Sequence, residues 1–213
     1  MIRVGSAVSG QFLQLLALCS AFWTALALYA RRSPSPQTLR FAAALGLGAI
    51  FAHLGGALLH LPAVAEGPWA LLDPARGTTV LLVPLALALL ERSPAAFASL
   101  PLALAVARLG CLAAGCCHGA SGEPTPLVEI AGLLVLHAIV SRRPGHQVAA
   151  VVLGGFGLVR LLVEPLRAPP PLGEPLVPAA WIAAAWIALG GVLAIPRARA
   201  ARVRRSKPSL PVE

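Results

Sequence analysis

Two arginines, Arg108 and Arg160, interrupt long apolar stretches of the sequence, where a charged side chain is energetically costly. Glu164 lies four residues after Arg160 and Arg167 lies seven after it, so on a helix the three share one face. A guanidinium fork binds two oxygens of a phosphate at once. The pattern therefore predicts a phosphate-binding site. The alternative is structural: Glu164 forms an interhelical ion pair with Arg108, and Arg167 extends to the membrane surface.

The segment that follows Arg108 contains a second group of chemically capable residues. Its glycines allow close approach of the backbone to a neighbouring helix or a ligand. Its cysteines and histidine could suggest metal or redox chemistry, but adjacent cysteines do not easily bind one ion, and buried cysteine more often packs as a small apolar residue. We therefore expect no metal site. The residues concerned are Gly110, Cys111, Gly115, Cys116, Cys117, His118 and Gly119.

Glu129 lies about one turn into a stretch that begins at Pro124 and Pro126. Its carboxylate has two interpretations: it lies near the arginines, or it is an ordinary acidic residue stabilised by the helix dipole. His53 and His60 share one face of an earlier stretch, where packing among helices explains each equally well.

These residues are embedded in a strongly apolar chain of 213 residues. Charged residues make up 12% of it, against about a quarter in soluble domains, and hydrophobic residues make up 58%. Mean hydropathy is +0.81. Such a surface needs lipid as its solvent, so we expect an all-α polytopic membrane protein with no sizeable soluble domain. The apolar runs lie near 11–30, 41–62, 77–91, 95–117, 126–141, 147–166 and 178–195, the third and fifth of them short.

The runs also place the two arginines at a depth in the membrane. Arg108 lies about nine residues before the end of the fourth run, and Arg160 about six before the end of the sixth. At about 1.5 Å per residue, both side chains lie roughly 9–14 Å below the outer boundary. We therefore expect them to line one polar cavity that opens to the outer leaflet.

Basic residues between the runs fix the orientation. The basic clusters follow the first, third, fifth and seventh runs, which with seven spans puts every cluster on one side. The alternate connections hold mostly Glu66, Asp73, Arg76, Glu123 and Glu174. The N-terminus is then outside and the C-terminus cytoplasmic, with a transmembrane domain over 1–196 and a basic cytoplasmic tail over 197–213. The tail holds six of the seventeen basic residues and no interleaved aromatic residue, which favours anionic-lipid contact over nucleic-acid binding. The basic residues that follow the first, third and fifth runs are Arg31, Arg32, Arg40, Arg92, Arg142 and Arg143.

The three segments together resemble the prolipoprotein diacylglyceryl transferases, bacterial membrane enzymes that attach lipid to lipoprotein cysteines. The order and spacing of the family's motifs agree from about residue 107 to 167, and seven helices with the N-terminus outside is also the family's topology. The central signature, G-R-[IL]-G-[NC]-F with later glycines, is matched by Arg108, Gly110, Cys111, Gly115 and Gly119. The motif H-P-[ST]-Q-L-Y-E is matched by Pro124, Thr125, Leu127 and Glu129. The late motif G-[YF]-G-x-x-R-[FL]-x-x-E-x-x-R is matched by Gly155, Phe156, Gly157, Arg160, Glu164 and Arg167.

The resemblance implies a reaction in the bacterial cytoplasmic membrane. Phosphatidylglycerol, or a similar anionic phospholipid, would give its diacylglyceryl group to a lipobox cysteine of a prolipoprotein, forming a thioether and releasing glycerol phosphate. Arg108 and Arg160 would stabilise the departing phosphate, with Glu164 and Arg167 orienting them. No cofactor is implied. The residues expected to line the substrate site are Arg167, Glu129, Gly110, Cys111, Gly115, Gly119, His60 and His118.

The sequence also departs from the family's pattern. Ala107, Glu123, Pro126 and Val128 replace the family's Gly, His, Gln and Tyr, and the arginine of the second helix, the histidine of the third-helix region and the periplasmic head are missing. The phosphate-binding half of the site is kept, and the half that would activate a thiol is reduced. Two alternatives are therefore a lipid-binding protein without this activity, and a thiol redox or metal protein. Replacing the cysteines by Ala or Ser separates them, because only the last should lose activity.

Overall fold

The computed structural model describes residues 4–33, 36–59, 82–115, 119, 122, 124–166 and 177–206. These residues form seven α-helices and no β-strand, which confirms the predicted all-α fold. A 3₁₀ turn, Glu164–Leu166, follows the sixth of these helices. The helices are α1 (Val4–Ala30), α2 (Pro36–Leu59), α4 (Val83–Leu90), α5 (Pro94–Ala113), α6 (Thr125–Ser141), α7 (Gly145–Val163) and α8 (Val177–Ser206).

Four helices in the described residues are long and apolar enough to cross a membrane: α1, α2, α5 and α7. Shorter apolar helices cover Thr125–Ser141 in α6 and Ala179–Ala194 in α8. The prediction of a polytopic membrane protein is thereby confirmed. The third predicted run is described only in part, as the eight residues of α4, which span about 12 Å.

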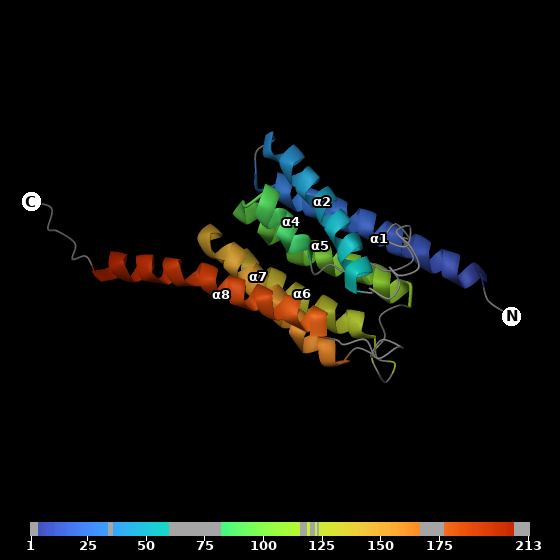
Figure 1. The fold of residues 1–213 in the computed structure, drawn as a ribbon. Coiled ribbons are helices and arrows are strands. Elements are labelled where there is room, and N and C mark those ends of the chain that lie inside the picture. The colour runs from blue at the N-terminus through green and yellow to red at the C-terminus, as the bar shows by residue number, and fades with distance from the viewer. Residues whose placement is uncertain are drawn as a thin grey trace, which may run out of the picture.

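Helix α5 is the centre of the bundle. It packs against α1 and α4 on one side and against α6 and α7 on the other (Figure 1). Of the four long apolar helices, α5 is the most buried. The buried share of its apolar span is 72%, against 17–50% in the other three. Its bounds follow from its sequence. Ser93 caps the first turn by accepting a hydrogen bond from the N–H of Ala96 at 3.3 Å, and Gly115 ends the helix with φ of +65°.

Glycines bring the outer helices close to their neighbours. A Cβ on Gly110 of α5 would lie 2.5 Å from the Cβ of Ala17 in α1. A Cβ on Gly157 of α7 would lie 2.5 Å from the carbonyl oxygen of Ala183 in α8, and one on Gly190 would lie 2.6 Å from the backbone nitrogen of Gly154. Small residues at helix contacts are how membrane helices approach closely. These glycines therefore fix the position of α1 against α5 and that of α8 against α7.

The turns α1–α2, α4–α5 and α6–α7 lie at one end of the bundle, and α1 begins at the other end, opposite the end of α8 (Figure 1). Basic residues occupy these three turns, as the predicted topology requires: Arg31, Arg32, Arg92, Arg142 and Arg143. Which end faces the cytoplasm stays a prediction. Helix α8 continues to Ser206, so the first part of the predicted tail is helical, and the division at residue 196 also stays a prediction.

Candidate functional site

Four charged side chains lie buried at the end of the bundle opposite these basic turns. Arg108 comes from the last part of α5, Glu129 is the fifth residue of α6, and Arg160 lies in the last turn of α7, followed by Glu164. Between 2% and 7% of each residue is exposed. An isolated buried charge costs several kcal/mol, so these groups must neutralise one another.

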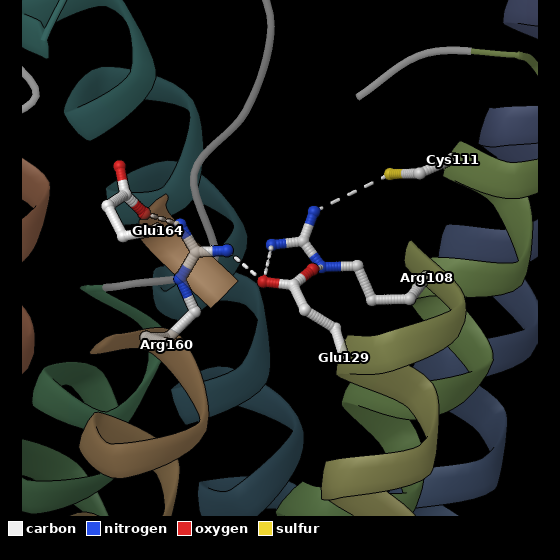
Figure 2. A network of polar contacts seen from close by, with 5 residues as sticks. All are labelled: Arg108, Cys111, Glu129, Arg160 and Glu164. Atoms are coloured by element: carbon white, nitrogen blue, oxygen red, sulfur yellow. Dashed lines mark hydrogen bonds and ion pairs between the residues drawn. The ribbon is translucent and has the colours of Figure 1, made fainter. Parts of the chain in front are cut away.

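The carboxylate of Glu129 joins the two arginines (Figure 2). Its Oε2 lies 2.5 Å from Nε of Arg108, and its Oε1 accepts a longer bond, 3.4 Å, from Nη2 of the same side chain. Oε1 also pairs with Nη1 of Arg160. One acidic residue of α6 therefore ties α5 to α7.

Arg160 binds a second carboxylate through its other terminal nitrogen. Its Nη2 donates to Oε2 of Glu164 at 3.2 Å, one helical turn further on. Helix α7 ends at Val163, and the N–H of Glu164 still bonds to the carbonyl of Arg160. This last helical bond keeps the two side chains on one face, although Pro165 follows within the 3₁₀ turn. Arg160 is thus held by two carboxylates on two helical segments.

Cys111 completes the described part of this site. Its buried thiol sulfur accepts a hydrogen bond from Nη1 of Arg108 at 3.6 Å (Figure 2). Within the described residues no group of three His, Cys, Asp or Glu side chains is arranged to bind a metal ion. Cys116, Cys117 and His118 lie outside those residues, so the metal or redox alternative is not tested on them.

The structure brings Arg108 and Arg160 together, because both bind the same carboxylate. Their roles in a substrate site stay a prediction. For Glu129 the interpretation near the arginines is confirmed. The structural alternative named Glu164 as the interhelical partner of Arg108. The structure gives that role to Glu129 and pairs Glu164 with Arg160. The need for a second carboxylate was readable from the sequence, since Glu164 alone cannot neutralise two buried arginines. The polar cavity around them stays a prediction.

Two of the glycines predicted to contact substrate have an evident scaffold role. Gly110 faces α1, and Gly115 ends α5 in a left-handed conformation. Gly119 is buried. Their contact with substrate stays a prediction. The remaining predicted residues, His60, His118 and Arg167, lie outside the described part of the chain.

An apolar cavity of about 150 Å³ lies on the other side of α5. Helices α1, α2, α4 and α5 line it with apolar side chains, among them Phe22, Leu45 and Leu104. Its lining on α5 reaches Ala107, the residue before Arg108. The charged site and an apolar space suited to hydrocarbon therefore lie at neighbouring levels of α5, on different faces of that helix.

The comparisons with known proteins give one match. The family model for prolipoprotein diacylglyceryl transferase matches residues 12–196, which include every described helix that carries the charged site. No curated protein and no solved structure matches the chain.

Proposed function

Because the chain belongs to the prolipoprotein diacylglyceryl transferase family, we propose that it transfers the diacylglyceryl group of phosphatidylglycerol to a cysteine thiol of a prolipoprotein. The family consists of membrane transferases that act on lipid and lipoprotein substrates. The anionic donor, the lipobox acceptor and the bacterial cytoplasmic membrane are our proposals for this chain.

The observation that carries the proposal is the joining of Arg108 and Arg160 by Glu129. In the reaction, the bond between the glyceryl carbon and the phosphate oxygen breaks, and a carbon–sulfur bond forms. The electron pair of the broken bond stays on glycerol phosphate, whose negative charge increases by one, and the proton of the thiol passes to water. Two arginines fixed in a buried site stabilise that charge, because their forks match phosphate oxygens.

Glu129 has a definite part in this proposal. Two arginines and two carboxylates have a formal net charge of zero, and the Glu129 carboxylate occupies guanidinium positions that a phosphate would use. A lipid phosphate must therefore displace Glu129 from at least one arginine. Glu164 keeps Arg160 in place while this happens, because it binds Nη2, the terminal nitrogen that Glu129 does not bind.

The apolar cavity supports a donor with long acyl chains. It is lined by side chains of four helices and reaches Ala107, beside the proposed phosphate site. A phospholipid combines an anionic phosphate with hydrocarbon chains. The arginine site suits the phosphate, and the apolar cavity suits the chains. A water-soluble phosphate ester would use the arginines alone.

The direct test supplies the purified protein with phosphatidylglycerol and a synthetic lipobox peptide. Mass spectrometry should show a peptide that gains one diacylglyceryl group, with an equal amount of glycerol phosphate released. The same peptide with Ser in place of Cys is the control and should stay unmodified. Absence of the adduct, under conditions in which a standard family member forms it, contradicts the proposal.

The second candidate is a lipid-binding protein without transferase activity. The specific observation that favours it is the formal charge balance of the site, because such a network also stabilises a bundle without any reaction. Phosphatidylglycerol that binds in an Arg160-dependent manner and yields no peptide adduct would favour this candidate.

A further inference from the structure

A second charged site lies at the other end of α5. A cavity of about 260 Å³ is formed where the start of α2 meets the end of α4 and the turn into α5. Its polar lining consists of Gln37, Arg40, Glu91, Arg92 and Ser93, and two leucines complete it. Fifteen residues of α5 separate Ser93 from Arg108, a rise of about 22 Å, so the two sites lie at opposite ends of the bundle.

Glu91 is the unusual member of this cavity. The residue is only 6% exposed, yet within the described residues its carboxylate takes part in no ion pair. It accepts one long hydrogen bond, 3.3 Å, from the N–H of Ser93. Buried carboxylates normally satisfy several hydrogen bonds or a counter-charge. The cavity that Glu91 lines therefore suits a cationic hydrogen-bond donor.

Two exposed arginines line the same cavity and suit an anion. Arg92 donates its Nε to the carbonyl of Ala88 at 2.7 Å, and among the described residues its two terminal nitrogens make no hydrogen bond. Arg40 reaches the cavity from α2. In the described part of the chain neither arginine lies within ion-pair distance of Glu91. A buried negative group and two exposed positive groups thus surround one space.

We propose that this cavity binds the zwitterionic headgroup of an aminophospholipid, in the leaflet opposite the Arg108–Glu129–Arg160 site. The primary ammonium binds the Glu91 carboxylate, and the phosphodiester binds Arg40 and Arg92. A phosphate alone leaves Glu91 without a counter-charge, and a simple cation leaves the two arginines without one. The predicted orientation makes this the cytoplasmic leaflet.

The test compares two lipids that differ at the headgroup nitrogen: the primary ammonium of one donates hydrogen bonds, and the bulkier trimethylammonium of the other donates none. The full-length protein is incubated in micelles with equal amounts of phosphatidylethanolamine and phosphatidylcholine of identical chains, and retained lipid is counted by native mass spectrometry. The wild-type protein should retain phosphatidylethanolamine with about tenfold preference, the order expected for one hydrogen bond to a charged group. Equal retention of both lipids by the wild-type protein overturns the proposal.

The variants assign the preference to this cavity. Glu91→Gln should reduce the preference to near unity, and Arg92→Gln should weaken retention of both lipids. Arg143→Gln, an exposed arginine of the α6–α7 turn at the same end, should change neither. An undiminished preference in Glu91→Gln overturns the proposal. If Glu91→Gln does not fold, the exposed Arg92 provides the second variant. Retention of phosphatidylglycerol that depends on Glu91 and exceeds that of phosphatidylethanolamine overturns the assignment to an aminophospholipid.

Discussion

Glu129 binds both Arg108 and Arg160, and Glu164 adds a second carboxylate to Arg160. Removing any one of these side chains leaves an uncompensated charge in a buried position, which is strongly destabilising. Residues that share such a network do not act independently. We therefore expect the effects of double substitutions among them to differ from the sum of the single effects.

Replacing Arg160 tests whether the reaction needs the two terminal nitrogens of its guanidinium group. Arg160→Ala should lower the rate of adduct formation by about 10²–10³-fold or more, as loss of a charge-stabilising donor does. Arg160→Lys should not restore it, because one ammonium cannot reproduce the two terminal nitrogens that bind Glu129 and Glu164. The measurement is the initial rate with lipobox peptide, and Arg142→Lys in the exposed α6–α7 turn is the control. Full activity of the Lys variant would exclude a bidentate role.

Glu129→Gln removes the negative charge and nearly preserves the shape of the side chain. In neutral detergent this variant should lose about 3–5 kcal/mol of stability, the usual effect of breaking a buried ion pair. Anionic phosphatidylglycerol should recover much of the loss, because its phosphate replaces the missing carboxylate between the arginines. Thermal unfolding in the two environments measures this difference. An equal loss with and without the anionic lipid would argue against phosphate binding at this position.

At the scale of the helices, the sequence predicted which residues form helices better than which residues of different helices contact each other. The apolar runs predicted a common depth for Arg108 and Arg160, because that depth follows from the number of residues to the end of each run and the rise per residue. The bridging role of Glu129 depends on how α6 is rotated between α5 and α7, which is set by packing. The contact of Gly110 with Ala17 joins residues far apart in the chain, and no local pattern indicates it. Glu91 belongs to no motif, so its burial was not foreseen.

Adjacent glycines of α8 provide a matched test of helix packing. A Cβ on Gly190 would lie 2.6 Å from a backbone nitrogen of α7, whereas one on Gly191 would meet no atom within 4 Å. Gly190→Ala should therefore force α8 away from α7 and lower stability by about 1–3 kcal/mol, the usual cost of overpacking. Gly191→Ala should leave the unfolding temperature unchanged or slightly raised. Equal effects of the two substitutions would show that α7 and α8 do not approach at Gly190.

At the scale of the whole molecule, the predicted orientation can be tested by chemical labelling. With the native cysteines replaced by Ala, a Cys in place of Pro124 should react with a membrane-impermeant maleimide in intact cells. A Cys in place of Ser141 should react only after the cells are opened. Both positions are exposed, and they lie at opposite ends of α6. The reverse labelling pattern would invert the topology and place the arginine site in the cytoplasmic leaflet.

The link between Arg108 and Glu129 also bears on the order in which the protein is built. Ribosomes deliver α5 to the membrane before α6, and the carboxylate follows the arginine by 21 residues. Until α6 arrives, α5 carries an unneutralised guanidinium, which opposes insertion by about 2.5–3.5 kcal/mol near the centre of a helix. We expect α5 and α6 to enter the bilayer together, as a hairpin whose charges cancel. The translocon would then retain α5 until its partner has been synthesised.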